Sequence, residues 1–491
     1  MTSPPPIADA MRPVVHFTPE RNWMNDPNGM FYYDGEYHLF FQYNPEGDTW
    51  GHMSWGHAVS RDLITWEHLP VAIPEQPDFM IYSGSAVVDW NNTSGFGVSG
   101  QPPLVAVFTA HYKDRPMQNQ HIAYSTDRGR TWRLFSGNPV LDAGEADFRD
   151  PKVFWHEPTN RWIMVVAFSI RRKLAFYASP DLKHWTHLSD FGPAGSIEGI
   201  WECPDLFPLP VAGRSGDHKW LLLLNMNPGH PAGGSGCQYF VGGFDGTRFI
   251  PEADEVLWVD HGPDFYAAVT WSDIPTRDGR RIMLGWMNNW NYANKTPTSP
   301  WRGMMSIPRV VSLRETARGY RLVQSPLEEV MRYGDPEQDH HFKGALEDAA
   351  VWLSGLPVLG PAMSARFEFE GWSSGQSVWI AISAGDQGRV EVALDPDNGK
   401  VVVDRSRSTS SFADNYSVIH EAPFELKQSD FSVQLVLDVH SLEVFVADGQ
   451  ASISHQVFLA GECRRLSVHS HRSSGGVVDI TLRPFVRGRV P

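Results

Sequence analysis

Cysteine is scarce in this sequence, with only Cys203, Cys237 and Cys463 among 491 residues. An odd number of widely spaced cysteines supports neither a disulfide framework nor a zinc site. Positive charge is also in deficit, because 41 Lys and Arg face 57 Asp and Glu and the formal net charge is −16. Nucleic acids and anionic membranes attract clustered positive charge, so this balance argues against both as partners and favours a neutral one.

Long apolar runs are missing as well. None approaches the roughly 20 residues that span a bilayer, so we expect a soluble protein with no membrane partner. The first residues, Met1-Thr2-Ser3-Pro4-Pro5-Pro6, lack the basic and then apolar segments of a secretion signal. The sequence leaves open whether such a signal was removed and which oligomeric state the protein adopts.

Aromatic residues, by contrast, are abundant, at 12% of the chain with 19 Trp. A Trp face is a common stacking surface for the apolar side of a sugar ring. Because β-rich cores also use Trp, we assign most of the 19 to the core. At 491 residues the chain exceeds one compact core, which predicts two domains.

Strand-like runs dominate the chain, and long helical periodicity is nearly absent. The clearest predicted strands are short and rich in β-branched and aromatic residues, at 36–43, 104–109, 162–168, 220–224 and 281–286. A weak repeat, Ser-x-Asp followed by Trp, begins at Ser60, Ser125 and Ser179, with a degenerate copy at Gly243. Each copy predicts a tight hairpin between the last two strands of a unit.

The intervals of 65, 54 and 64 residues between these copies suit units of four short strands, the blades of a β-propeller. Cutting the chain in this way predicts five blades over residues 15–324. The fifth blade would use strands at 266–271, 281–286, 303–308 and 320–323. The predicted fold class is therefore all-β, a five-bladed β-propeller followed by a second β domain.

A connecting segment and a second domain are predicted after the propeller. Residues 325–339 are interpreted as a helical linker, with a short helix at 326–331. Beyond it, polar and apolar residues alternate at 365–370, 389–394 and 441–446, which predicts half-buried antiparallel strands. We interpret residues 340–491 as a C-terminal β-sandwich, and no catalytic constellation stands out in it.

Isolated motifs, most of them acidic, recur at a similar phase of the propeller repeat. Asp26, Ser83, Asp150, Glu202 and Asp264 are separated by 57, 67, 52 and 62 residues. Similar phase means similar position in each blade, so we expect these motifs on the innermost strands, converging on one end of the central channel. Each motif alone is an ordinary turn, and the shared phase of three acids is what favours an active site.

The three acids suit the hydrolysis of an acetal with retention. That reaction uses a carboxylate nucleophile and a carboxylic acid that first protonates the leaving oxygen and later activates water. Amide donors from Asn25 and Asn28 favour an ionised Asp26, so we assign Asp26 as the nucleophile.

Glu202 lies between Trp201 and Cys203, a less polar setting that favours the protonated acid, so we assign it as the general acid/base. Asp150, beside Arg149, is expected to stay ionised and to accept hydrogen bonds from sugar hydroxyls. A retaining mechanism predicts a separation of roughly 5 Å between the carboxyl groups of Asp26 and Glu202.

The motifs also resemble those of a known family. In the family's order, they are the Trp-Met-Asn-Asp-Pro-Asn-Gly run at 23–29, Phe-Gln-Tyr-Asn-Pro at 41–45, Trp50 with 55–58, Tyr-Ser-Gly-Ser at 82–85, 148–151, 201–205 and 285–287. The chain thus resembles the invertase, inulinase and levanase family of β-fructosidases, glycoside hydrolase family 32. That family's five-bladed propeller and C-terminal β-sandwich agree with the fold predicted from the repeat.

The resemblance implies a covalent fructosyl-enzyme on Asp26, with Glu202 as acid/base and Asp150 holding fructose hydroxyls. It also implies that a terminal fructose pocket is lined by Asn25, Gln42, Trp50, Ser83, Arg149, Tyr266 and Trp286, with Trp301 a weaker match. The implied substrate is a fructan, levan or inulin, or sucrose. No cofactor or metal is expected.

Two other functions stay open. A levan fructotransferase would share the first half-reaction and release a cyclic difructose, the choice depending on loops near 75–82, 111–121 and 226–237. A non-catalytic fructan-binding protein is disfavoured because binding alone would not require all three acids. A polymeric substrate favours secretion, although a cytoplasmic location is not excluded.

Overall fold

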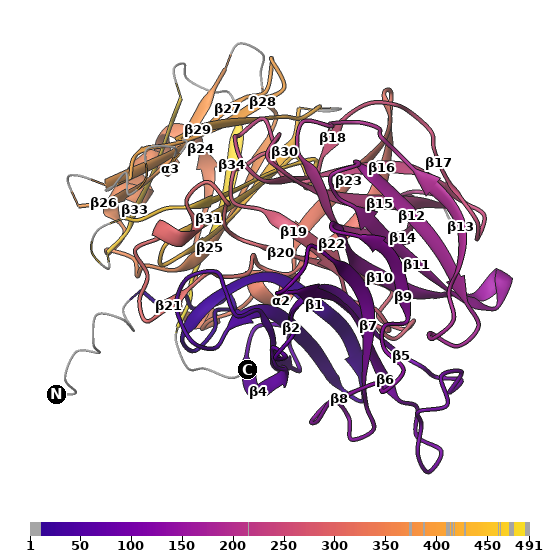
Figure 1. Cartoon of the computed structure of the whole chain (residues 1–491). Helices are drawn as coiled ribbons and strands as arrows, with labels where there is room; N and C mark the ends of the chain where they lie inside the picture. Colours follow the sequence, from indigo (N-terminus) through magenta and orange to yellow (C-terminus); the bar gives the residue numbers. More distant parts are fainter. Residues whose placement is uncertain are drawn as a thin grey trace.

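Strands make up most of the computed structural model, as Figure 1 shows. The structure describes residues 11–486 except 215, 373–375, 386–387, 409–412, 414–415, 417, 427–428, 460, 462 and 471–475. Helices within this part of the chain are short: α2 (Glu328–Met331), α3 (Leu346–Gly355) and the 3₁₀ turns η1 (Glu157–Thr159), η2 (Ala293–Lys295) and η3 (Pro336–Gln338). None of these described helices is long and apolar enough to cross a membrane.

The first part of the chain forms five mainly antiparallel sheets that follow one another in sequence. Their strands, sheet by sheet, are β1 (Asn22–Tyr33), β2 (Glu36–Asn44), β3 (Ser54–Ser60) and β4 (Trp66–Ile73); β5 (Phe79–Val88), β6 (Leu104–Tyr112), β7 (Gln118–Ser125), β8 (Arg133–Leu134) and β9 (Leu141–Glu145); β10 (Phe148–His156), β11 (Arg161–Phe168), β12 (Lys173–Ser179) and β13 (Thr186–Phe191); β14 (Ile200–Pro210), β15 (His218–Asn227), β16 (Gly236–Phe244), β17 (Phe249–Pro251) and β18 (Leu257–Trp258); and β19 (Tyr266–Thr270), β20 (Arg281–Trp286), β22 (Arg309–Thr316) and β23 (Gly319–Pro326). The clearest strands predicted from the sequence are all among them.

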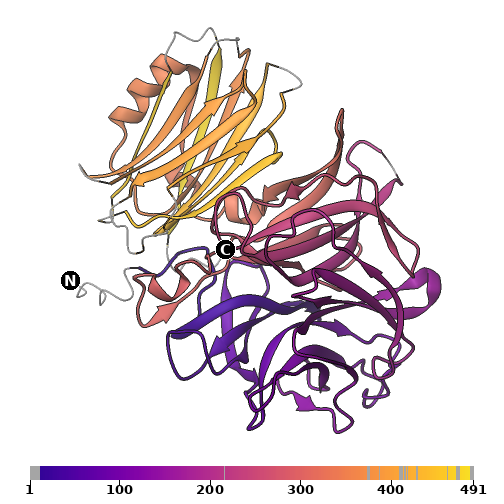
Figure 2. The ribbon, with the colours of Figure 1, turned by 45° about the horizontal axis from the view of Figure 1, so that its top comes forward.

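The first strands of these sheets form a ring. β1, β5, β10, β14 and β19 contact one another in this order, and β19 returns to β1. A short strand, β21 (Trp301–Arg302), pairs in parallel with the start of β1 and joins the two ends of the ring. A closed ring of inner strands around a channel is the arrangement of a β-propeller. Figure 2 shows its sheets fanning out beside the orange and yellow C-terminal domain.

The Ser-x-Asp repeat forms the turn between the third and fourth strands, as predicted. In the first sheet, Asp62 Oδ1 accepts hydrogen bonds from the backbone N–H groups that follow it, at 2.9 Å for Ile64. Asp127, Asp181 and Asp245 accept equivalent backbone bonds in the next three sheets. The carboxylates therefore close the hairpins, which explains why an acidic residue recurs at this position.

Each inner strand carries a β-bulge at an equivalent position. The pairing register shifts between Met24 and Pro27, Ile81 and Gly84, Arg149 and Lys152, Glu202 and Asp205, and Tyr266 and Val269. Within three of these bulges, Asp150, Cys203 and Ala267 have φ angles of 66°, 43° and 52°. A bulge bends the strand and re-aims its side chains, so the five breaks direct neighbouring residues towards the channel.

The third strand of the fifth sheet is not where the sequence predicts it. Residues 303–308 contribute only an isolated bridge at Met305, and β22 and β23 occupy the outer half of the sheet. The N–H of Met305 bonds to the carbonyl of Phe17 instead of to a neighbouring strand. Residues 303–308 instead connect β21, which pairs with β1, to β22, and they contact the N-terminal segment at Phe17.

The C-terminal domain is a β-sandwich. One sheet has the order β24 (His340–Ala345), β34 (Val477–Pro484), β25 (Met363–Glu370), β30 (Phe431–Asp438), β31 (Ser441–Val446) and β32 (Ala451–Gln456), and the other has the order β29 (Ile419–Pro423), β28 (Lys400–Arg407), β27 (Gly388–Asp395), β26 (Val378–Ala384) and β33 (Arg465–Ser470). Alternate residues such as Val390, Val392 and Leu394 of β27 fill the core between the sheets. The predicted class, an all-β propeller followed by a sandwich, is confirmed.

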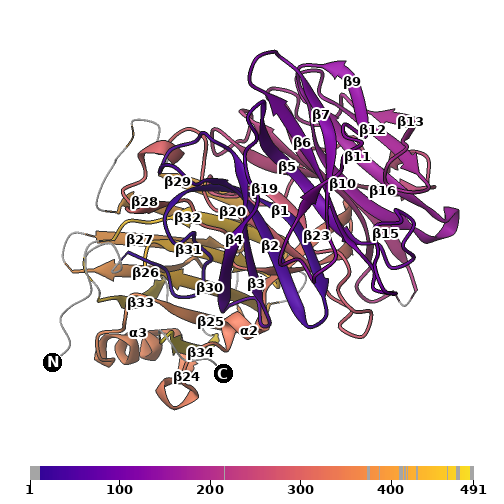
Figure 3. The same cartoon turned by 60° about the horizontal axis from the view of Figure 1, so that its bottom comes forward.

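A buried set of charges joins the two domains, which lie side by side in Figure 3. Arg309 of β22 is fully buried and donates to Asp260 at 2.8 Å and, across the interface, to Glu443 of β31 at 3.1 Å. His16, which precedes β1, lies between Asp438 at 2.8 Å and the same Glu443 at 3.0 Å. Since each buried charge has an opposite partner, the interface has one preferred geometry.

Candidate active site

One end of the propeller channel opens into a cavity of about 300 Å³. It is lined by Asn25, Asp26, Gln42, Trp50, Tyr82, Ser83, His111, Gln118, Asp147, Arg149, Asp150, Ile200, Glu202, Asn227, Tyr266 and Trp290. Nine of the ten site residues proposed from the sequence are in this set. The tenth, Trp286, is fully buried behind it and contacts the lining through Tyr266 and Trp290, with ring centroids 6.5 and 4.9 Å apart.

Asp26 lies in the bulge of β1 and is held by two donors. Asn25 Nδ2 donates to its Oδ1 at 3.0 Å, and the Ser83 hydroxyl donates to its Oδ2 at 2.8 Å. The indole N–H of Trp23 donates to Asn25 Oδ1 at 2.7 Å, which turns the amide nitrogen towards Asp26. The aromatic and amide residues of the first motif therefore orient this carboxylate. Asn28, expected to help, donates instead to the backbone carbonyl of Asp26.

Glu202, in the bulge of β14, has a more polar setting than the sequence suggested. Arg149 Nε donates to its Oε1 at 3.1 Å, and the Tyr266 hydroxyl donates to its Oε2. Arg149 also bonds to Asp147 at 2.9 Å. The prediction of a weakly polar environment for Glu202 is wrong, because Arg149, which lies on the neighbouring inner strand β10, donates to it.

Asp150, in the bulge of β10, accepts a hydrogen bond from the backbone N–H of Cys203 at 2.9 Å. The Cys203 thiol is 3.5 Å from Asp150 Oδ2 and 3.6 Å from Asp26 Oδ2. This thiol links the bulges of β1, β10 and β14 at the floor of the cavity. Cys203 is thus buried as expected, and it also contacts two of the three acids.

Burial disfavours negative charge on two of these acids. It raises the pKa of Asp26, while the hydrogen bonds from Asn25 and Ser83 oppose the shift. It also raises the pKa of Asp150 to about 7, although the charge of Arg149 acts in the other direction. Burial is the largest cause of this rise and the charge of Glu202 adds to it, so Arg149 offsets the rise in the pKa of Asp150 only in part. The ionisation of Asp150 stays a prediction.

The rest of the cavity suits a polar ligand with an apolar face. Gln42 Nε2 is buried and has no hydrogen-bond partner among the described residues, so it is free to donate to a ligand. At the rim, Tyr82 stacks on His111 with centroids 4.5 Å apart, and Trp50, 41% exposed, meets Tyr82 edge-on. These rings form an aromatic wall above the acids.

Several lining residues were not identified from the sequence. His111, Gln118 and Asn227 fall within loops that were expected to shape acceptor choice, but no individual residue was chosen there. Asp147 and Ile200 carried no signal of their own. Trp290 could have been found, because it lies in the aromatic and amide-rich run that follows Trp286.

Two sequence-derived candidates lie elsewhere. Asp264, expected on the innermost strand of the fifth blade, precedes β19 and bonds to Arg405 of the sandwich at 2.7 Å. Trp301, the weaker match, is buried in β21. Among the described residues, no group of three or more His, Cys, Asp or Glu side chains is arranged to hold a metal ion.

Three carboxyl groups on bulged inner strands, beneath an aromatic wall, define a glycosidase built on a β-propeller with an attached β-sandwich. Residues 16–326 match the family model described as the N-terminal domain of glycosyl hydrolases family 32, and residues 336–484 match the C-terminal model of that family. The chain belongs to glycosyl hydrolases family 32.

Known relatives agree over nearly the whole chain. A levanase of Bacillus subtilis is 44% identical over 490 residues, covering 96% of this chain and 70% of the relative. An extracellular exo-inulinase of Aspergillus niger is 38% identical over 507 residues, covering 95% of this chain and 93% of the relative. The crystal structure of exo-inulinase from Aspergillus awamori superposes with a TM-score of 0.88 at 35% identity, covering 97% of this chain and 98% of that one.

Proposed function

We propose that this chain is a retaining, exo-acting β-fructosidase that removes terminal fructosyl units from fructans or sucrose. The observation that carries the proposal is the meeting of Asp26, Asp150 and Glu202, from three different strands, in one cavity of about 300 Å³. The names of the relatives, levanase and exo-inulinase, support the substrate class.

In the first step, Glu202 gives its proton to the leaving oxygen while Asp26 attacks the anomeric carbon. The bond from that carbon to the leaving oxygen breaks, and a covalent fructosyl-enzyme forms on Asp26. The hydrogen bonds from Asn25 and Ser83 favour the ionised Asp26 that this attack requires. Glu202 then takes a proton from water, which attacks the same carbon and releases Asp26.

Asp150 holds sugar hydroxyls during both steps. Its Oδ2 is fixed by the Cys203 N–H, so the carboxyl group presents a defined face to the ligand. Because the pKa of Asp150 is raised to about 7, this group can also donate a hydrogen bond below that pH. Gln42 supplies a further donor through its unpaired Nε2.

Exo action follows from the shape of the site. Below the acids, the bulges leave only a small cavity of about 10 Å³, lined by residues including Asp150, Cys203 and Pro204. This volume admits no more than a water molecule. This narrow space supports a site that is closed below the acids and receives a chain end from its open side.

We also propose residues 15–324 as the catalytic domain, 325–339 as the connecting segment and 340–491 as a supporting domain. All residues that line the active-site cavity come from the first of these. Secretion is proposed as well, since the substrate is a polymer and the exo-inulinase relative is named extracellular.

The test is to digest levan, inulin and sucrose in parallel and to resolve the products with time. We expect free fructose from the start, and nuclear magnetic resonance should detect β-fructose before mutarotation. Initial α-fructose would indicate inversion and would contradict Asp26 as a nucleophile. A cyclic difructose from levan would identify a fructotransferase. The absence of any product from all three substrates would indicate a non-catalytic fructan-binding protein.

A further inference from the structure

A second and larger cavity, of about 900 Å³, lies at the other end of the propeller channel. The same inner strands reach both cavities. On β10, Asp150 lines the active site, whereas Lys152 and His156 line the second cavity. On β14, Glu202 and Asp205 are divided in the same way. The space between them, with Asp150 and Lys152 in its lining, has a volume of only about 10 Å³, which is too small for a sugar ring.

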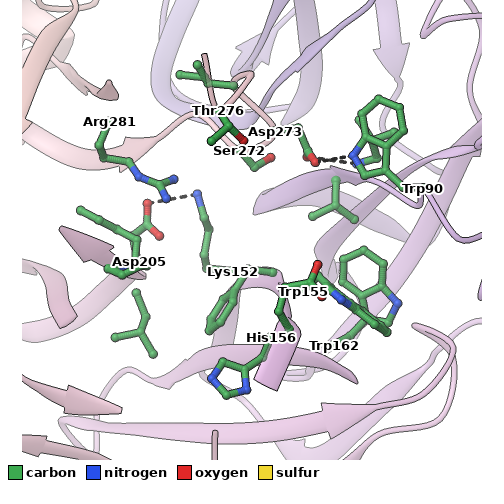
Figure 4. Close-up of a pocket in the computed structure, with 18 of the residues that line it drawn as sticks. Trp90, Lys152, Trp155, His156, Trp162, Asp205, Ser272, Asp273, Thr276 and Arg281 are labelled. Atoms are coloured by element: carbon green, nitrogen blue, oxygen red, sulfur yellow. Dashed lines mark hydrogen bonds and ion pairs between the residues drawn. The ribbon is translucent and has the colours of Figure 1, made fainter. Parts of the chain in front are cut away.

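One side of the second cavity carries charged groups with hydrogen-bonding capacity to spare. Figure 4 shows Lys152, Asp205 and Arg281 pointing towards one another there. Asp205 Oδ2 accepts from Lys152 at 3.0 Å and from Thr270 N–H at 2.8 Å. Asp205 Oδ1 is buried without a hydrogen-bond partner among the described residues. A buried charged oxygen of this kind calls for a donor from water or from a ligand.

The opposite side of the cavity is aromatic. Trp90 is 59% exposed, and its indole N–H donates to Asp273 Oδ1 at 2.9 Å, which fixes the orientation of the ring. Trp155 and Trp162 lie on the same side in Figure 4, with centroids 5.1 Å apart. An exposed Trp held in one orientation by a buried-side partner is suited to stack against an apolar ligand face.

The charges of the cavity lining nearly cancel, with two basic side chains against three acids, one of them at the rim. Lys152 and Arg281 stand against Asp205 and Asp273, and the remaining acid, Glu157, is exposed at the rim. The cavity therefore does not select an anion such as phosphate or a cation. Aromatic rings facing paired polar groups suit a neutral molecule that has many hydroxyls and an apolar face.

We propose that this cavity is a second sugar-binding site, which takes a short fructan segment. The identity of the sugar rests on the proposed function, since that function supplies the polymer. Because the space between the two cavities is too small for a sugar ring, a chain in the active site cannot continue into the second cavity. The second site therefore holds another chain, or a distant part of the same polymer, and keeps the enzyme near its substrate.

The direct test is binding to Glu202→Gln protein, which should not consume the ligand. We expect levan-derived fructotetraose to bind at two sites per chain by titration calorimetry, and Trp90→Ala to remove one of them. A matched control is Trp379→Ala, which removes a partly exposed Trp from the sandwich strand β26 and should keep both sites. One site per chain in all three proteins would overturn the proposal.

Turnover separates this inference from the proposed function. With Glu202 intact, Trp90→Ala should raise KM for levan by about threefold to tenfold, as expected for one lost aromatic contact, and leave sucrose hydrolysis unchanged. Equal kinetics of Trp90→Ala and Trp379→Ala on levan would contradict the second site while leaving the fructosidase intact. If the parent protein released no fructose, the proposed function would fail, and the calorimetry would still count sites.

A second variant covers the case in which Trp90→Ala does not fold. Thr276 is exposed and lines the same cavity. Thr276→Trp should fill the entrance without disturbing the bond between Trp90 and Asp273. It should abolish the second binding event, and two remaining sites in a folded Thr276→Trp protein would refute the assignment.

Discussion

The ionisation of Asp26 depends on the balance between its burial and its side-chain hydrogen-bond donors. Burial raises the pKa of this carboxyl group, and the hydrogen bonds from Asn25 and Ser83 act against that rise. The proposed nucleophile must be ionised, so activity should fall as pH drops through the pKa of Asp26. The acid limb of the pH profile therefore reports the local hydrogen bonds.

Removing one donor should move that limb. Ser83→Ala loses the bond of 2.8 Å to Asp26 Oδ2, so the pKa of Asp26 should rise further. We expect the acid limb of kcat/KM to move to higher pH by about one pH unit, the worth of one hydrogen bond to a charged group. The measurement is a pH profile on sucrose.

Ser85→Ala is the matched control. It removes a hydroxyl from the same strand that bonds to the carbonyl of Pro151 and the N–H of Val153, and not to Asp26. Its acid limb should coincide with that of the parent protein. Coincidence of the Ser83→Ala limb with the parent would mean that this hydroxyl does not support the charge.

Glu202 should be indispensable for natural substrates. Glu202→Gln keeps the shape of the side chain but removes its proton transfer, so kcat should fall by about 10²- to 10⁴-fold. Glu198→Gln, four residues earlier and exposed outside the cavity, should keep parent activity. Near-native turnover of sucrose by Glu202→Gln would show that another group is the acid.

At the scale of elements, bulges place the acids. Five inner strands break register at equivalent positions, and a Gly accompanies one of these breaks at residue 84. A Cβ on Gly84 would lie 2.1 Å from the carbonyl oxygen of Val107 and 2.7 Å from the Cα of Phe108. Since both atoms belong to the backbone of β6, neither can move aside.

Gly84→Ala should therefore shift the bulge that positions Ser83. We expect a loss of about 1–3 kcal/mol in the free energy of unfolding, as for other overpacked sites, and a lower kcat. Thermal unfolding and sucrose turnover provide the measurement. Gly243→Ala, in the propeller strand β16 with open space around its Cβ position, should be neutral in both. Equal behaviour of the two variants would exclude the clash.

Elements also mark the limits of prediction from sequence. Turn residues and alternation are local, and the hairpins after Ser60, Ser125 and Ser179 were predicted correctly. The strand at 303–308 was not, because its residues form an irregular segment in which Met305 bonds to Phe17, far away in sequence. Periodicity cannot reveal such a segment.

At the scale of the whole molecule, a buried histidine links the N-terminal segment to the sandwich. Burial alone would lower the pKa of His16, but its hydrogen bonds to Asp438 and Glu443 raise it to about 9. A raised folded-state pKa stabilises the protein fully below the ordinary value of 6.5. This stabilisation is lost as pH rises through about 9.

His16→Gln should accordingly lower the melting temperature most at acidic to neutral pH. Protonated His16 with its two acidic partners contributes up to about 3 kcal/mol to the free energy of unfolding below pH 6.5. The parent should therefore lose stability between pH 6.5 and 9, while the stability of the variant should change little over that range. Thermal unfolding across that range is the measurement. His341→Gln, an exposed histidine, should retain the parent slope. If His16→Gln showed the same dependence of melting temperature on pH as the parent, a group other than His16 would be responsible for it.

The sequence by itself determined most of the strands, the hairpin turns and the propeller and sandwich class, and it singled out three acids that the structure brings into one cavity. These follow from alternation, turn chemistry and a repeat that a short window of sequence contains. Only the tertiary structure decided that Arg149 pairs with Glu202, that Trp290 replaces Trp286 in the lining and that Asp264 serves the domain interface. Arg149 and Glu202 are 53 residues apart, and the closed ring of inner strands brings them together. Asp264 and Arg405 are 141 residues apart, and the docking of the sandwich on the propeller brings them together.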